Sequence, residues 1–376
     1  MGEILKAYIV PHPPIIIPEI GKGQETGASE TMKAYDQIGR QIKELAPQVI
    51  IITTPHGTAY ENYIHISPGK KLTGSFASFG APELKYQFDS DTQLIDKIIE
   101  KSHLSGIDSG TLGARDRELD HGTLVPLYHI AKYYSDFSLI RISIAGLPLE
   151  QLYIFGSCIQ KAVEQSDKNV VIIGSGDLSH RLKADGPYGF AEEGPAFDEY
   201  IVQAIKTCDF KKLLEADANF CERAGECGLR SFAILAGALN SYNVKSNVLS
   251  YEGPFGVGYM VAEMSIDGQD LSRDLVSYYV CKHRSEIEAT RKAEDVYVTL
   301  ARTTLEHFIK KGKAIDIPDY LPAEMLNRKA GVFVSIKKHG MLRGCIGTIN
   351  PVTNSIAEEI IQNAISAGTR DPRFNP

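Results

Sequence analysis

Four histidines stand in short segments rich in proline or glycine, which restrict the orientation of a side chain. These segments are Pro11-His12-Pro13-Pro14, Thr54-Pro55-His56-Gly57, Asp120-His121-Gly122 and Gly174-Ser175-Gly176-Asp177-Leu178-Ser179-His180. Two imidazoles and one carboxylate form a ligand set that holds iron(II) and leaves positions open for oxygen and substrate. A single histidine in such a loop more often has a structural role, but the recurrence of the pattern predicts a divalent metal site.

The remaining ligand of this site is expected in Ala224-Gly225-Glu226-Cys227-Gly228. This glycine-flanked segment precedes a helix predicted from residue 231. A Glu226 carboxylate favours iron or manganese, whereas a Cys227 thiolate favours zinc, copper or iron with soft ligands. Glu226 also has an alternative role at the helix start, where the helix dipole favours an acidic side chain. The residues alone leave the third ligand open between Glu226 and Cys227, with Glu252 as a weaker alternative.

The elements that must position these side chains can be read from the apolar pattern. Short apolar runs bounded by turn residues predict buried parallel strands at 7–10, 49–53, 139–144 and 170–173. Helical patterns are found at 29–45, 91–103, 149–165, 198–215 and 231–241. This alternation predicts an α/β fold with a mixed or mostly parallel central sheet flanked by helices. Ligands bind beyond the carboxyl ends of such strands, so His12, His56 and His180 are expected to converge on one crevice.

Composition excludes several other classes of protein. Hydrophobic residues make up 43% of the chain and charged residues 23%, as in ordinary globular proteins. The formal charge of −7 argues against a nucleic-acid partner. No stretch approaches the roughly 20 apolar residues of a membrane span, and the N-terminus lacks the pattern of a signal peptide. The six cysteines form no CxxC pair, which is typical of reduced thiols. We therefore expect a cytoplasmic protein that binds neither membrane nor nucleic acid.

The length of 376 residues predicts more than one domain. We expect a first domain over 1–267 and a densely charged, partly helical connection over 268–292. A smaller α+β domain is expected over 293–376, with helices at 295–311 and 355–367 and a strand at 331–336.

The histidine segments together resemble a known family. The sequences Val10-Pro11-His12-Pro13-Pro14-Ile15, Pro55-His56-Gly57, Asp120-His121-Gly122-Thr123-Leu124-Val125-Pro126-Leu127 and Gly176-Asp177-Leu178-Ser179-His180 occur in the order seen in class III extradiol ring-cleavage dioxygenases. They resemble the LigB-like catalytic-subunit superfamily, which also contains the Memo proteins. The resemblance implies that His12 and His56 bind nonheme Fe(II), that His180 acts as acid and base, and that His121 lines the substrate site.

The third ligand differs between the two branches of this superfamily. Ring-cleaving members use a glutamate, which would be Glu226, whereas Memo-type members place a cysteine in a Cys-Gly pair, which would be Cys227. Asp177 also matches an aspartate of the Memo type. The resemblance therefore implies one of two functions. The first is Fe(II)-dependent oxidation of a catecholic or related aromatic substrate by O2. The second is metal binding without ring cleavage, with zinc, copper or manganese as alternatives to iron.

The C-terminal segment Leu342-Arg343-Gly344-Cys345-Ile346-Gly347-Thr348 resembles the AMMECR family. AMMECR domains usually continue past residue 374, so we expect the second domain to be cut short. Cys345 is either a nucleophilic thiol beside Arg343 or a thiol packed in a structural turn. Fusion of the two domains resembles a microbial system with a radical S-adenosylmethionine protein, which implies such a partner in the modification of another molecule. Association with further copies of the chain stays open.

Overall fold

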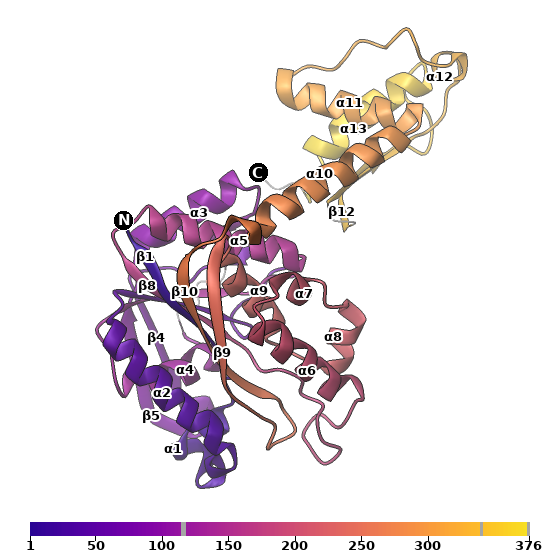
Figure 1. The fold of residues 1–376 in the computed structure, drawn as a ribbon. Coiled ribbons are helices and arrows are strands. Elements are labelled where there is room, and N and C mark those ends of the chain that lie inside the picture. The colour runs from indigo at the N-terminus through magenta and orange to yellow at the C-terminus, as the bar shows by residue number, and fades with distance from the viewer. Residues whose placement is uncertain (114–117, 339–340, 374–376) are drawn as a thin grey trace. The chain divides into compact units, whose positions relative to one another are not determined.

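The computed structural model describes residues 1–113, 118–338 and 341–373 (Figure 1). It divides into two compact units, residues 1–279 and 280–376, which are treated separately below. Helix α10 (Leu275–Ala293) crosses the boundary between them. Among the described residues, none of the helices has both the length and the apolar character that a membrane span needs.

The first unit is built on a six-stranded sheet in the order β7-β2-β8-β1-β10-β9. Its first four strands in that order are parallel, while β10 runs antiparallel to β1 and β9 antiparallel to β10. The strands are β1 (Glu3–Val10), β2 (Val49–Thr54), β7 (Ser138–Ser143), β8 (Asn169–Ser175), β9 (Tyr242–Glu252) and β10 (Tyr259–Gln269). This arrangement confirms the predicted mostly parallel α/β sheet.

Side chains of the parallel strands alternate between two apolar cores because successive residues of a strand point to opposite faces. In β2, Val49 and Ile51 join one core, whereas Ile50 and Ile52 join the other. The first core lies beneath α3 (Thr92–Leu104), α5 (Leu149–Glu164), α6 (Glu193–Lys206), α7 (Phe210–Leu214) and α9 (Leu229–Ala238). The second core lies beneath α2 (Ser29–Leu45), α4 (His121–Ala131) and the hairpin of β4 (Lys71–Phe76) and β5 (Ala81–Asp89). The sheet is thus buried on both faces, which accounts for its nearly continuous apolar strands.

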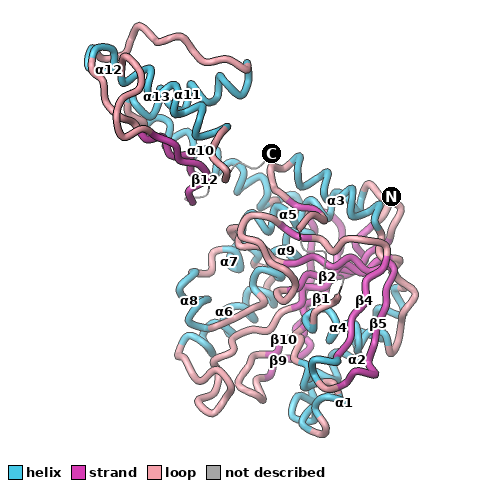
Figure 2. The backbone as a smooth tube through the Cα atoms, turned by 180° about the vertical axis from the view of Figure 1, so that it is seen from behind, coloured by secondary structure: helices cyan, strands magenta, loops and turns pink. Residues whose placement is uncertain are grey.

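Figure 2 shows β4 and β5 side by side as an antiparallel hairpin outside the central sheet. The shorter elements of this unit are η1 (Pro14–Ile16), α1 (Pro18–Gly21), η2 (Gln24–Ala28), β3 (Ile64–His65), η3 (Ala77–Phe79), β6 (Ser109–Gly110), α8 (Ala218–Ala224) and η4 (Leu271–Arg273).

Two predicted elements differ from the structure. The single helix expected over 198–215 is two helices, α6 and α7, because Cys208 adopts a left-handed conformation with φ of 52° and Asp209 then caps α7. The segment around His121, expected to be a loop, is the start of α4. The Asp120 side chain accepts a hydrogen bond from the backbone N–H of Thr123 and so caps this helix.

The second unit contains α11 (Val296–Lys311), α12 (Ala323–Asn327), α13 (Ile356–Thr369) and an antiparallel pair of strands, β11 (Phe333–Lys338) and β12 (Met341–Gly347). Its apolar core is formed by Leu300, Leu321, Met325, Ile356, Ala357, Ile360 and Ile361. Cys345 lies on β12 and is half-buried; its Sγ accepts a hydrogen bond from Ser335 Oγ at 3.3 Å, and its backbone N–H donates to Asp371. The carboxylate of Glu359 is fully buried and accepts hydrogen bonds from Thr348, from the backbone of Val352 and from Thr353.

Candidate metal centre

Three loops of the first unit meet at one edge of the sheet. His12 lies just after β1, His56 just after β2, and Asp177 and His180 follow β8. These strands are neighbours in the order β2-β8-β1 and run parallel, so their carboxyl ends lie together. The sheet topology therefore brings residues distant in sequence to one place.

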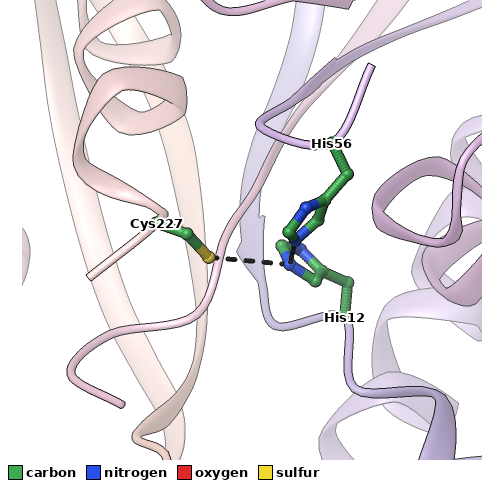
Figure 3. A group of neighbouring side chains, drawn as sticks. All are labelled: His12, His56 and Cys227. Atoms are coloured by element: carbon green, nitrogen blue, oxygen red, sulfur yellow. Dashed lines mark hydrogen bonds between the residues drawn. The ribbon is translucent and has the colours of Figure 1, made fainter. Parts of the chain in front are cut away.

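His12, His56 and Cys227 point toward one another (Figure 3). Nε2 of His12 lies 2.9 Å from Nε2 of His56 and 3.6 Å from Sγ of Cys227. The potential ligand atoms of the three side chains all lie within 4.8 Å of one another. Two imidazoles and a thiol are a donor set that binds zinc, copper or iron, so the residues present fit a metal ion.

Close contact between two glycines brings the Cys227 loop to the histidines. A Cβ atom added to Gly176, in the loop after β8, would lie 2.1 Å from Cα of Gly228. Residue 176 must therefore lack a side chain for the two loops to touch. A Cβ atom on Gly228 would instead lie 2.5 Å from the ring of Phe232 and 2.9 Å from the carbonyl oxygen of Asp177. The backbone N–H of Asp177 donates to Sγ of Cys227 at 3.3 Å, which fixes the thiol at this contact.

Burial makes the histidines neutral and keeps the thiol protonated. Burial, followed by the neighbouring charge of His56, lowers the pKa of His12 well below its ordinary value. Burial likewise lowers the pKa of His56. Burial and the charge of Asp177 raise the pKa of Cys227 well above its ordinary value. Neutral imidazoles are ready to bind a metal, and a bound cation reverses the balance at sulfur because it stabilises the thiolate.

Glu226 has a different environment from its neighbour. Its Oε2 accepts a hydrogen bond of 2.7 Å from the backbone N–H of Leu229, at the beginning of α9. Burial raises the pKa of Glu226 to about 6, although the hydrogen bond from Leu229 opposes this. Glu226 belongs to neither of the two potential metal-ligating groups found among the described residues.

Asp177 and His180 form a second group with Cys227, again with potential ligand atoms within 4.8 Å. Oδ1 of Asp177 accepts the backbone N–H of His12 at 2.8 Å. Burial nevertheless raises the pKa of Asp177 to about 6. Burial lowers the pKa of His180, whose Nε2 is buried and has no hydrogen-bond partner within the described parts of the chain. The ring centroids of Tyr188 and His180 lie 5.1 Å apart. His180 therefore has a nitrogen free to exchange a proton.

The loop that carries His180 is held by a buried carboxylate on α6. Asp198 is fully buried; its Oδ1 accepts the backbone N–H of Ser179 at 2.7 Å, and its Oδ2 accepts the hydroxyl of Tyr251 at 2.8 Å. Burial raises the pKa of Asp198 to about 7. The hydroxyl of Ser179 in turn donates to the carbonyl of Ala224, in the segment that leads to Cys227. This network joins the His180 and Cys227 loops.

His121 reaches the site from the first position of α4. Its ring stacks on that of His56 at 4.1 Å between centroids. Burial, with the charges of His56 and His12, lowers the pKa of His121 to about 3. The preceding residue, Asp120, is fixed by a hydrogen bond from Thr54 at 2.6 Å and by an ion pair with Arg141 at 3.0 Å.

A cavity of about 650 Å³ opens beside His56 and His121. Its lining includes Ser75, Ser78 and Phe79 at the β4–β5 hairpin. The Phe79 ring meets that of His121 edge to face at 5.4 Å. A volume of this size falls within the range of small-molecule sites, about 300–1,000 Å³.

Sequence reasoning missed several residues of this site. Phe79 and Arg141 line the cavity, and two further residues hold the segment of His12. Ser175 Oγ lies 2.9 Å from Nδ1 of His12, and the Tyr35 hydroxyl donates to the carbonyl of Pro11. Ser175 is the last residue of the otherwise apolar strand β8, and a hydroxyl at that strand end is a signal that the sequence contains. Nothing local in sequence distinguishes Tyr35 or Phe79 from other aromatic residues.

A cluster of potential metal ligands lies at the strand ends of the mostly parallel α/β sheet of the first unit. Residues 6–262 match the family of the catalytic LigB subunit of aromatic ring-opening dioxygenase, and the chain belongs to this family. Residues 298–376 match the AMMECR1 family. Both matches confirm the resemblances found in the sequence.

Several relatives have similar sequences. A protein of Clostridium acetobutylicum is 43% identical over 376 residues, which cover 98% of this chain and 80% of that protein. The 2-aminophenol 1,6-dioxygenase beta subunit of a Pseudomonas species is 23% identical over 298 residues, covering 72% of this chain and 97% of that subunit. A Thermotoga maritima protein is 45% identical over 84 residues, covering 22% of this chain and 48% of that protein.

Proposed function

We propose that the first unit is an iron(II)-dependent oxidoreductase that acts on a catecholic or aminophenolic substrate with O2. The observation that carries this proposal is the approach of His12, His56 and Cys227 beside a cavity, in a chain of the LigB family. These three side chains would hold the metal, with Cys227 in place of Glu226. Iron(II), when bound, would coordinate the substrate and oxygen next to each other, so that electrons of the substrate can reduce oxygen.

The protein's own residues would then position the substrate and move its protons. His180 Nε2, which is buried and unpartnered among the described residues, accepts a proton from a substrate hydroxyl group. The lowered pKa of His180 keeps this imidazole neutral and thus able to act as a base. His121 and Phe79 contact the substrate ring from the cavity wall, and neutral His121 offers one hydrogen bond without a charge.

Metal analysis combined with oxygen uptake tests this function. The full chain is loaded with Fe(II) without oxygen and then offered catechols and 2-aminophenols in aerated buffer. We expect oxygen consumption and a change in the absorption of the ring with the intact protein, and neither with His180→Ala. Loaded protein that consumes no oxygen with any of these compounds would contradict the dioxygenase proposal.

The third ligand is tested by two neighbouring substitutions. Cys227→Ser is expected to weaken metal binding strongly, whereas Glu226→Gln is expected to leave it nearly unchanged because Glu226 accepts a helix N–H instead. The opposite result would favour the carboxylate set of the ring-cleaving enzymes. Both variants keep the side-chain size, so each serves as a control for the other.

A second candidate function is favoured by the thiol itself. Thiolate ligands suit zinc or copper as well as iron, and a Memo-like protein would bind such a metal without cleaving a ring. It would act with a radical S-adenosylmethionine protein in the modification of another molecule. Tight binding of zinc or copper in preference to iron, together with no oxygen uptake, would support this candidate over the first.

A further inference from the structure

We propose that Ser175 is a positioning residue that fixes the tautomer of His12, so that Nε2 carries the lone pair directed at His56 and Cys227. This inference rests on the metal site of the proposed function, but it concerns a property that the protein has before any metal binds.

The position of Ser175 follows from the sheet register. It is the last residue of β8 and pairs with Val10 of the neighbouring parallel strand β1, two residues before His12. Its side chain is fully buried. Its Oγ lies 2.9 Å from Nδ1 of His12 and donates a short hydrogen bond to the carbonyl oxygen of Gly122. Water therefore does not compete for these contacts.

Counting protons assigns the tautomer. A serine hydroxyl has one proton, and a carbonyl oxygen can only accept. The proton of Ser175 is therefore used in the hydrogen bond to Gly122, and its oxygen is left to accept from His12. Nδ1 of His12 must then carry a hydrogen. A neutral imidazole has only one such hydrogen, so Nε2 then carries none and presents its lone pair.

The opposite tautomer would break this set of contacts. With the hydrogen on Nε2, Ser175 would have to turn its proton toward Nδ1, and the buried carbonyl of Gly122 would lose this donor. Leaving such a group unsatisfied is unfavourable in a buried site. Hydrogen bonds that orient a ligating histidine typically change metal affinity about 10–100-fold when they are removed. Ser175 also links two parts of the site, because Gly122 immediately follows His121.

The sheet offers a matched control. Ser143 is the last residue of the parallel strand β7 and is also fully buried, but its Oγ has no hydrogen-bond partner among the residues that the structure describes. Ser175→Ala and Ser143→Ala therefore remove the same atoms from equivalent ends of one sheet, and only the first removes a contact to His12.

Two measurements on the full chain test the proposal. The first uses metal-free protein with ¹⁵N-labelled histidine, in which His12 is assigned by its loss in His12→Gln. Its nitrogen shifts should show one tautomer, with hydrogen on Nδ1, in the intact protein and in Ser143→Ala, and a mixture in Ser175→Ala. The second is titration with Co²⁺ followed by absorption, in which Ser175→Ala should bind about 10–100-fold more weakly than Ser143→Ala.

An unchanged tautomer in Ser175→Ala overturns the proposal. So does a hydrogen on Nε2 in the intact protein, or a Co²⁺ affinity of Ser175→Ala equal to that of Ser143→Ala. Failure of the dioxygenase proposal would appear separately, as absent oxygen uptake in a protein whose tautomer and Co²⁺ binding follow the expectation.

Discussion

Replacing Asp120 by asparagine should destabilise the first unit by several kcal/mol, far more than a change at an ordinary helix cap. The reason is that the substitution leaves the charge of Arg141 without its partner. Arg141 pairs with Asp120 at 3.0 Å, and its side chain is only 3% exposed. Removing one member of a buried ion pair typically costs about 3–5 kcal/mol, because the other charge remains buried without compensation.

Two other variants separate the contributions of Asp120. Asparagine can still accept the N–H of Thr123, so Asp120→Asn removes the charge but keeps the cap of α4. Asp120→Ala removes both and should cost about 1 kcal/mol more. Asp91 caps α3 through the N–H of Leu94, so Asp91→Ala should cost only the same ~1 kcal/mol.

The assay is urea denaturation of the metal-free protein, followed by circular dichroism and repeated across pH. Burial opposes ionisation of Asp120, but the hydrogen bond from Thr54 and the charge of Arg141 outweigh it and lower its pKa. Its stabilising contribution is therefore present above the unfolded pKa near 4 and is lost as the pH falls through the lower folded value. The difference between wild type and Asp120→Asn should shrink on acidification. A cost below about 1 kcal/mol at pH 7, where a buried pair predicts about 3–5, would refute the reasoning.

Three further outcomes are expected. Since burial raises the pKa of Asp198 from 3.8 to about 7, wild type should lose stability relative to Asp198→Asn as the pH rises between these values, by roughly 4 kcal/mol in urea denaturation. A difference in stability that does not vary with pH would contradict this. Glu359→Gln should destabilise the second unit by about 2 kcal/mol, because an amide has less acceptor capacity than the buried carboxylate for the hydroxyls of Thr348 and Thr353. The affinity of the first unit for Co²⁺ should stay unchanged. Calorimetry measures the stability and a parallel titration measures the Co²⁺ affinity; unchanged thermal stability would argue against the role of Glu359. Metal at 100 times its dissociation constant should stabilise the intact protein by about 2.7 kcal/mol, and a chelator should remove this gain. In thermal denaturation at the same metal concentration, Cys227→Ser should show little of this stabilisation. An equal gain in that variant would argue against the thiol as ligand.

The sequence predicts the sheet well because its strands are buried on both faces. Runs such as Val49–Thr54 are apolar almost throughout, so their type and approximate ends can be read directly. Because His12 and His56 lie in the loops that follow two such strands, the sequence also places both at the same edge of the sheet. The hairpin of β4 and β5 gives a weaker signal, because β4 is buried only at alternate positions and β5 only at Ala81 and Phe88, so neither strand is a continuous apolar run. Phe79 at its turn could not be placed beside His121 for that reason.

The third ligand shows a different limit of sequence reasoning. Glu226 and Cys227 are adjacent, and each has a residue type suited to a metal. Their environments differ because the loop turns between them, with Glu226 directed to the N–H of Leu229 and Cys227 to His12. The next residue, Gly228, packs closely against Gly176, which lies far away in sequence. Long-range packing of this kind leaves no local pattern.

The place of β1 in the sheet has a consequence for biosynthesis. Strand β1 precedes both of its neighbours in the chain, because it lies between β8 and β10, which begin at Asn169 and Tyr259. At the usual speed of translation, about 5–20 residues per second, β1 waits on the order of ten seconds or longer for its neighbours. During that interval its apolar residues have no strand to pair with, and a nascent chain in this state is a natural client for chaperones. His12 emerges long before Cys227, so this cluster of potential metal ligands is complete only after most of the first unit has been translated.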